Sequence, residues 1–367
     1  MINLSFFPSR QISFYLVRLF LTRSLAVLVA LILILMTLDL LGESGKILAV
    51  PGNGDADLWR YVGLRLPLLV SRFLPFSVLL GTLIAFVGLN QHSEVVAMKA
   101  AGLSAHQILA PLIVASLGIA AILFAFNETI VVKAQREVSA WSDNDYRSVP
   151  PDSGLLSNVW VLNGDHLVRA GLVAGRGSAM HAERVTIYER RAGIVERIVQ
   201  AKEAWPLPGG RGWQLRDVRL FDANMNVIRR LPRLDSMAGI TPSQLTLARV
   251  DPTELDYPTL QSRIAELQAA GRPTDEARAG LAHKISGPLS TLLMPLLAAL
   301  AAFGLARSGQ VLMRAVLGMA LGFAYFVADN FSLAMGNAGA YPPLIAAWAP
   351  FLLFLLIGET VLVRSEE

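Results

Sequence analysis

Catalysis would first be sought among the histidines, serines and cysteines of this sequence. There is no Cys, which excludes thiolate catalysis and Cys-type metal sites, and no serine lies in a nucleophile-elbow motif. No two histidines have the helical spacing of metal ligands. We interpret them as surface or interfacial residues. The five are His92, His106, His166, His181 and His283.

A second candidate is the segment Gly42-Glu43-Ser44-Gly45-Lys46, which partly matches the end of a phosphate-binding loop. Ile47 stands where a magnesium-binding Ser or Thr is required, and Leu40 stands where the first Gly is required. The topology argued below also puts this segment on the side of the membrane away from ATP. We therefore expect no ATP, metal or other cofactor in this chain, and we do not expect an enzyme.

Residues 92–104 predict a short helix outside the membrane. Ser93 suits an N-cap, Glu94 favours the helix N-terminus, and Gly102 suits a helix end. About two turns are too short to cross a bilayer, and the segment is too apolar for a solvated loop. Three side chains then need a cover: Val95, Met98 and Leu103. The membrane interface is one possible cover, and a cytoplasmic motor subunit docked on the helix is the one we favour.

Isolated charges near apolar segments are candidates for holding an anionic lipid head group. Ionisable residues inside membranes are costly and usually face a cavity or a partner. We expect a positive rim at the outer membrane surface, made by Lys46, Arg72, Lys133 and Arg136. Alternatively, Arg72 snorkels outward, and Lys133 and Arg136 lie on a solvated helix face. Asp329 either pairs across helices or faces the interfacial water, and we favour a structural role over direct lipid contact.

The composition requires a membrane environment for much of the chain. Of its 367 residues 54% are hydrophobic and 16% charged, and the mean hydropathy is +0.50. A soluble globular protein has roughly 25% charged residues. The net charge of +4 does not indicate nucleic-acid binding, because the basic residues are scattered and are not interleaved with aromatic ones.

Six segments are long and apolar enough to span a bilayer, which takes about 20 residues of helix. They are about Phe20 to Leu41, Leu66 to Leu89, Ile108 to Phe126, Ile285 to Ala306, Ala315 to Ala334 and Leu344 to Val363. We expect the first to be an uncleaved span, because no small-residue cleavage site follows it. The chain thus divides into residues 1–126 with three spans, a central domain at 127–284, and residues 285–367 with three more.

Basic residues in the short connections predict the orientation. The side of the termini holds Arg10, Arg18, Arg23, Lys99, Arg307, Arg314 and Arg364, whereas the other side holds Lys46, Arg60 and Arg65. Both termini should therefore be cytoplasmic, and the central domain should face outward.

The central domain shows the period-two alternation of half-buried strands. The candidates are Val159 to Leu162, His166 to Ala170, Ala179 to Glu189, Ile194 to Lys202, Trp213 to Phe221 and Val227 to Leu234. Asn163-Gly164-Asp165 and Pro208-Gly209-Gly210 supply turns. We expect an antiparallel sandwich or open roll, then an amphipathic helix over Asp256 to Ala270.

The same residues resemble a known family, the lipopolysaccharide export permeases LptF and LptG. The most specific match is the run from Ser93 to Ser104, SEVVAMKAAGLS. His283-Lys284-Ile285 followed by Pro288 resembles the family's entry into the fourth span. The stretch from Gly318 to Pro350, with Asp329 and Tyr341-Pro342-Pro343, is closer to the LptG members than to the LptF members.

This resemblance implies a bacterial inner-membrane subunit of an ABC transporter that extracts lipopolysaccharide. It implies an LptF-like second permease, an LptB-like ATPase dimer that binds the ATP and magnesium, an LptC-like partner, and a periplasmic β-jellyroll that passes lipid onward. Family members often place several lysines after the first span, whereas here Lys46 stands alone.

Two further expectations concern the outward domain. If it conducts lipid, its strands should form an apolar groove for acyl chains at inward positions such as Val185, Ile187 and Ile198. The alternative to a permease is an envelope scaffold or assembly factor whose outward domain binds protein, and a copurifying ATPase separates the two.

Overall fold

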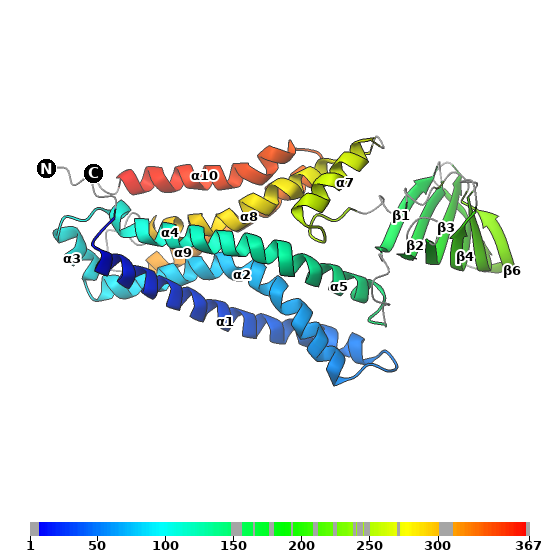
Figure 1. Cartoon of the computed structure of the whole chain (residues 1–367), viewed down its shortest axis with the longest axis horizontal. Coiled ribbons are helices and arrows are strands. Elements are labelled where there is room, and N and C mark those ends of the chain that lie inside the picture. Colours follow the sequence, from blue (N-terminus) through cyan, green and yellow to red (C-terminus); the bar gives the residue numbers. More distant parts are fainter. Residues whose placement is uncertain are drawn as a thin grey trace. The chain divides into compact units, whose positions relative to one another are not determined.

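The structure is a computed structural model of the whole chain (Figure 1). It describes residues 7–147, 156–163, 166–175, 180–191, 194–207, 212–222, 226–237, 240, 245, 250–269, 272–300 and 311–364. The chain forms two compact units. Unit 1 comprises Met1–Gly42, Val62–Ala134 and Pro252–Glu367, and unit 2 comprises Glu43–Tyr61 and Gln135–Asp251.

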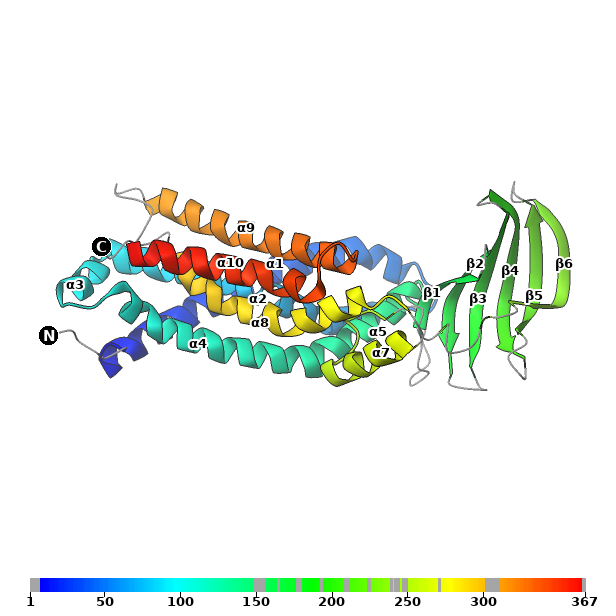
Figure 2. The same cartoon turned by 90° about the horizontal axis from the view of Figure 1, so that it is seen from above.

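Helices make up the described part of unit 1 and run alongside one another (Figures 1 and 2). Three helices, the first, the second and the fifth, belong partly to unit 1 and partly to unit 2. The helices are α1 (Arg10–Leu48), α2 (Asp55–Gln91), α3 (Glu94–Ala100), α4 (Ala105–Phe126), α7 (Tyr257–Ala269), α8 (Asp275–Ala299), α9 (Val311–Asn337) and α10 (Pro343–Arg364). After α4 the chain continues through a π-helical turn, η1 (Asn127–Val131), into α5 (Val132–Asp143).

Within the described residues, five helical segments are long and apolar enough to cross a membrane. They are Arg10–Leu48, Asp55–Gln91, Ala105–Asp143, Val316–Asn337 and Pro343–Arg364, and they correspond to five of the six expected spans. The remaining expected span, Ile285 to Ala306, starts inside α8 and continues into residues outside the described ones, so the sixth span stays a prediction.

Helix α8 lies in the core of unit 1, where every residue from Leu293 to Ala299 is buried. Small residues bring the helices around it close together. A Cβ on Gly358 of α10 would lie 2.6 Å from Leu296 Cδ2 of α8, and one on Gly81 of α2 would lie 2.5 Å from Ser24 Cα of α1. Such small-residue contacts are how helices associate in lipid, where no hydrophobic driving force joins them.

The amphipathic helix expected after the central domain is confirmed as α7. Its three expected apolar residues, Leu260, Ile264 and Leu267, are all buried. Gly271, the expected stop, lies outside the described residues.

All six expected strands of unit 2 are confirmed. They are β1 (Leu156–Asn163), β2 (His166–Ala174), β3 (His181–Arg191), β4 (Ile194–Pro206), β5 (Trp213–Asp222) and β6 (Val227–Ser236). They form one antiparallel sheet in the order β1-β2-β3-β4-β5-β6. Of the expected turns, Gly164, Asp165 and Pro208-Gly209-Gly210 lie outside the described residues.

One face of this sheet is the core of unit 2. Val168, Val185, Val199 and Val218 are buried there, together with residues that follow β6, such as Leu245. The Trp213 indole N–H donates to the Ile240 carbonyl over 2.9 Å, which ties that following segment to the sheet. The described strands follow sequence order, whereas a jellyroll needs crossover connections. The described strands therefore show a meander with one buried face.

Candidate functional site

The short helix between the second and third spans is present as α3, and its two ends behave differently. Gly102 has a φ of +89°; the Leu103 N–H donates to the Met98 carbonyl and the Gly102 N–H to the Lys99 carbonyl. This is a Schellman ending, which confirms Gly102 as the terminator. Ser93 is at the N-cap position, as expected, but its backbone is left-handed (φ 58°) and its side chain makes no capping hydrogen bond. A side-chain N-cap normally needs an extended backbone.

The chain itself supplies part of the cover that α3 was expected to need. Val95 is only 3% exposed and belongs to the core of unit 1, and Met98 and Leu103 pack against the same core. The chain therefore buries Val95 and leaves Met98 and Leu103 partly exposed. The apolar residue that α3 leaves open is Val96, which is 64% exposed, beside the exposed Ala97 and Ala100.

Two polar contacts hold the helices near α3. The Tyr15 hydroxyl of α1 donates to Glu94 Oε2 over 2.9 Å, and His106 Nε2 of α4 lies 3.3 Å from Glu359 Oε2 of α10. The start of α1 and the end of α10 lie at this end of unit 1 (Figure 2). Glu94 is therefore partly engaged within the chain, and α3 is a fixed surface rather than a loose loop.

Unit 1 also contains a partly buried ion pair. Lys284 Nζ of α8 lies 2.7 Å from Glu128 Oε1 of the π-helical turn, and the side chains are only 12% and 14% exposed. The Tyr257 N–H, at the start of α7, donates to the other oxygen of Glu128. One carboxylate thus joins three helical elements. A π-helical turn that presents such a residue is often found at functional sites.

A second pair lies one residue away. His283 Nε2 is 3.0 Å from Asp329 Oδ2 of α9, with side chains 28% and 15% exposed. The favoured structural role of Asp329 across helices agrees with this contact. His283, interpreted as a surface or interfacial residue, is partly exposed, and the sequence did not indicate the distant carboxylate that lies beside it.

A third pair joins α1 to α2. Arg65 donates two hydrogen bonds to Asp39, over 2.9 Å and 3.0 Å. A bidentate arginine–carboxylate contact fixes geometry as well as charge. Sequence reasoning missed this pair and the partnership of Lys284 with Glu128. The one signal was the presence of charges at the ends of otherwise apolar segments, which marks a need for a partner without identifying it.

The four expected rim cations divide between the two units. Arg72 and Lys133 belong to unit 1, where both are exposed. Lys46 and Arg136 belong to unit 2; Lys46 Nζ lies 2.8 Å from Glu43 Oε1, and Arg136 is exposed. Convergence of the four on one head group therefore stays a prediction.

The expected acyl-chain residues do not share one face of the sheet. Ile187 is opposite Val199 in the β3–β4 ladder, whereas Ile198 is opposite Tyr188. Val185 and Ile187 are therefore on the core face, at 1% and 3% exposed, whereas Ile198, at 8% exposed, is buried on the opposite face. Both core-face residues are enclosed by the core of unit 2. A groove that uses these positions stays a prediction.

Comparison with known proteins relates both units to one family. The family model described as lipopolysaccharide export system permease LptF/LptG matches residues 14–364. The chain is 25% identical over 352 residues to the lipopolysaccharide export system permease protein LptG of Escherichia coli strain K12, covering 93% of this chain and 94% of that protein. It is also 25% identical to the LptG protein of Haemophilus influenzae, covering 86% and 89%.

The family match starts within α1, ends at the last described residue of α10, and includes the whole sheet between. Its extent agrees with the arrangement of apolar helices before and after a six-stranded antiparallel sheet. The chain therefore belongs to the lipopolysaccharide export system permease LptF/LptG family.

Proposed function

We propose that this chain is the LptG-type permease subunit of an ABC transporter in the bacterial inner membrane. It extracts lipopolysaccharide and passes it to a periplasmic bridge that leads to the outer membrane. The family match over residues 14–364 carries this proposal, because it includes the membrane helices and the sheet together. Curated relatives of similar length are named LptG, which favours that branch of the family.

The proposed topology has six spans, cytoplasmic termini and a periplasmic, jellyroll-like central domain. Five apolar helices support it directly, and α8 supplies the start of the remaining span. The excess of Lys and Arg in the short connections beside the termini supports the orientation.

The proposed energy source is an LptB-like ATPase dimer, which binds ATP and magnesium outside this chain. An LptF-like second permease and an LptC-like partner complete the assembly. The surface offered to the ATPase is the open side of α3, with Val96, Ala97 and Ala100, because Val95 is buried and Met98 is partly buried against the core.

The proposed lipid path uses the cations Lys46, Arg72, Lys133 and Arg136 for the head group and the inward side of the sheet for acyl chains. Since Val185 and Ile187 are enclosed, lipid reaches them only when the covering residues after β6, among them Ile240 and Leu245, move away. In this structure the proposed acyl-chain path is therefore closed, and lipid entry must open it.

Purification of the complex from detergent tests the proposed function. Purified from its native membrane, the tagged chain should retain an ATPase and a second permease in stoichiometric amounts, and lipopolysaccharide should stimulate ATP hydrolysis in proteoliposomes. Retention of envelope proteins without any ATPase would overturn the proposal and favour a scaffold.

The role of α3 is tested at Val96. We expect Val96→Arg to reduce the copurified ATPase at least five-fold, because it places a charge in the apolar contact, while Val96→Thr, of nearly equal size, retains most of it. Glu94→Arg is less specific, since it also breaks the hydrogen bond from Tyr15. Tyr15→Phe is its control. Full ATPase retention by Val96→Arg would exclude α3 as the docking surface.

A further inference from the structure

The face of the sheet opposite the core carries a row of polar side chains that crosses all six strands. Each residue is the ladder partner of the next, so all point to the same face. The row runs Trp160, Arg169, Thr186, Gln200, Arg219 and Arg230. We call it the polar row.

Beside the polar row, the strands bend. Arg184 and Asp217 have left-handed backbones, with φ of 52° and 51°, although neither is Gly. A Cβ on Gly171 would lie 2.9 Å from Arg184 Cβ, so the glycine leaves the room that the Arg184 side chain occupies. Strained non-glycine backbones that the surrounding structure maintains are concentrated at ligand-binding and catalytic sites.

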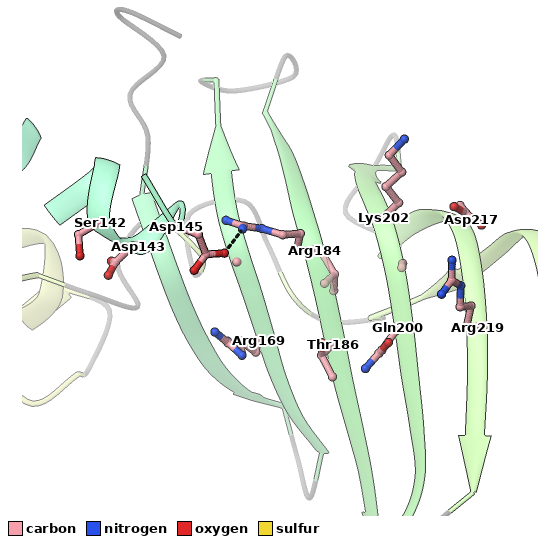
Figure 3. Close-up of a pocket in the computed structure, with 13 residues that line it drawn as sticks. Ser142, Asp143, Asp145, Arg169, Arg184, Thr186, Gln200, Lys202, Asp217 and Arg219 are labelled. Atoms are coloured by element: carbon pink, nitrogen blue, oxygen red, sulfur yellow. Dashed lines mark ion pairs between the residues drawn. The ribbon is translucent and has the colours of Figure 1, made fainter. Parts of the chain in front are cut away.

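This bend forms a hollow of about 680 Å³ on the polar face, within the size range of small-molecule sites (Figure 3). Four cations from four neighbouring strands line it: Arg169, Arg184, Lys202 and Arg219. Thr186 and Gln200 lie between them, and three carboxylates, Asp143, Asp145 and Asp217, also line the hollow.

The four cations differ in whether they form ion pairs or hydrogen bonds with other residues of the chain. Arg184 Nη1 lies 3.5 Å from Asp145 Oδ2, a loose ion pair whose carboxylate is 73% exposed. Lys202 and Arg219 are exposed, and neither has a hydrogen bond or ion pair within the part of the chain that the structure describes. These two donors are therefore available to an anion. Guanidinium and ammonium groups bind phosphate by charge-assisted hydrogen bonds.

An aromatic platform adjoins the hollow at the start of the polar row. Trp160 is 40% exposed and stacks on Tyr188 with ring centroids 6.1 Å apart. The Arg169 guanidinium lies 5.5 Å from the Trp160 ring. An indole held in this way offers an amphipathic flat surface, on which the apolar face of a sugar ring can stack.

We propose that this hollow binds a phosphorylated saccharide. Lys202 and Arg219 hold the phosphate, Thr186 and Gln200 hydrogen-bond the sugar hydroxyls, and Trp160 stacks on the ring. This site rests on the proposed function and deepens it, because a phosphorylated saccharide is the polar part of the proposed glycolipid cargo. A free sugar phosphate would meet the same chemistry.

Binding is measured on the purified full-length chain by saturation-transfer NMR and by tryptophan fluorescence. Four probes are compared: glucosamine 6-phosphate, glucosamine, inorganic phosphate and deacylated lipopolysaccharide. We expect the sugar phosphate to bind better than glucosamine or phosphate alone, with a fluorescence change that Trp160→Phe removes. Tighter binding of the deacylated glycolipid would identify the cargo as the source, and equal binding would indicate a free sugar phosphate.

The matched variants are Arg219→Gln and Arg229→Gln. Arg229 is opposite Leu220, a partly buried member of the core face, so it is an exposed arginine on the other side of the same sheet. We expect Arg219→Gln to weaken sugar-phosphate binding by roughly ten-fold, since a hydrogen bond to a charged group is lost, and Arg229→Gln to leave it unchanged.

Equal affinity in both arginine variants would overturn the site, as would inorganic phosphate binding as tightly as the sugar phosphate. An acidic peptide can be tested as a fifth probe. If it binds and none of the four other probes does, the face binds protein, and the proposed saccharide site is overturned. None of these results depends on transport, so a copurified ATPase with lipopolysaccharide-stimulated activity would leave the permease function standing.

Discussion

Charged residues have opposite surroundings in the two units. In unit 1 the pairs Glu128–Lys284 and His283–Asp329 are largely shielded and join helices that are distant in sequence. In unit 2 the charges of the polar row are spread over an open face, and Arg219 and Lys202 have no ion pair within the described residues. Since an unpaired charge is costly in an apolar environment and cheap in water, the first set stabilises the fold, whereas Lys202 and Arg219 are available to bind a ligand.

Among substitutions that compare the paired charges of unit 1 with exposed charges, we expect the largest loss of stability at Lys284. Lys284→Met leaves the Glu128 carboxylate shielded without its cation and should lower the free energy of unfolding by about 3–5 kcal/mol. Thermal unfolding in detergent measures this loss. The double variant Glu128→Gln with Lys284→Met should recover most of it, and the exposed Lys133→Met should stay close to wild type. A loss at Lys284 no greater than at Lys133 would break the comparison.

A middle-sized effect is expected at the contact between α1 and α2. Gly81→Ala places a Cβ 2.5 Å from the Ser24 backbone, so the helices must separate, at a cost of about 1–3 kcal/mol. Gly88→Ala in the same helix meets nothing within 4 Å and should be neutral or slightly stabilising. Equal melting temperatures for the two variants would show that close helix approach does not stabilise unit 1.

The smallest effect is expected for an exposed ion pair of the sheet. Arg197 Nε donates to Glu189 Oε2 over 2.6 Å, and the arginine side chain is 50% exposed. Arg197→Gln should change the free energy of unfolding by less than about 0.5 kcal/mol. A loss above about 2 kcal/mol, seen in the same melting experiment, would mean that charges on the sheet are structural too, against the contrast with unit 1.

The local sequence pattern predicted where each strand lies along the chain. It did not always predict which face of the sheet a residue is on. In β4 the neighbours Ile198 and Val199 are both apolar, so period-two alternation fits either face at that point. Pairing decides between them, because Val199 is opposite the buried Ile187. The left-handed backbone at Arg184 also interrupts the alternation of buried and exposed residues along β3. A strict period of two does not predict such an interruption.

The helix α3 teaches the same lesson for packing. Its length and its ending at Gly102 were predictable, because both depend on residues within one turn. Its cover was not. Val95, Met98 and Leu103 pack on a core that includes Leu16, Phe20 and Leu362, which come from the two ends of the chain.

The sequence by itself determined the membrane class, five of the spans, the six strands and the amphipathic helix α7, since composition, hydrophobic runs and periodicity are local properties. Tertiary structure alone decided which charge meets which. Glu128 and Lys284 are paired although 156 positions separate them, and no short-range pattern carries that information. The polar row likewise exists only after six strands have taken their register, because each strand contributes a single residue to it.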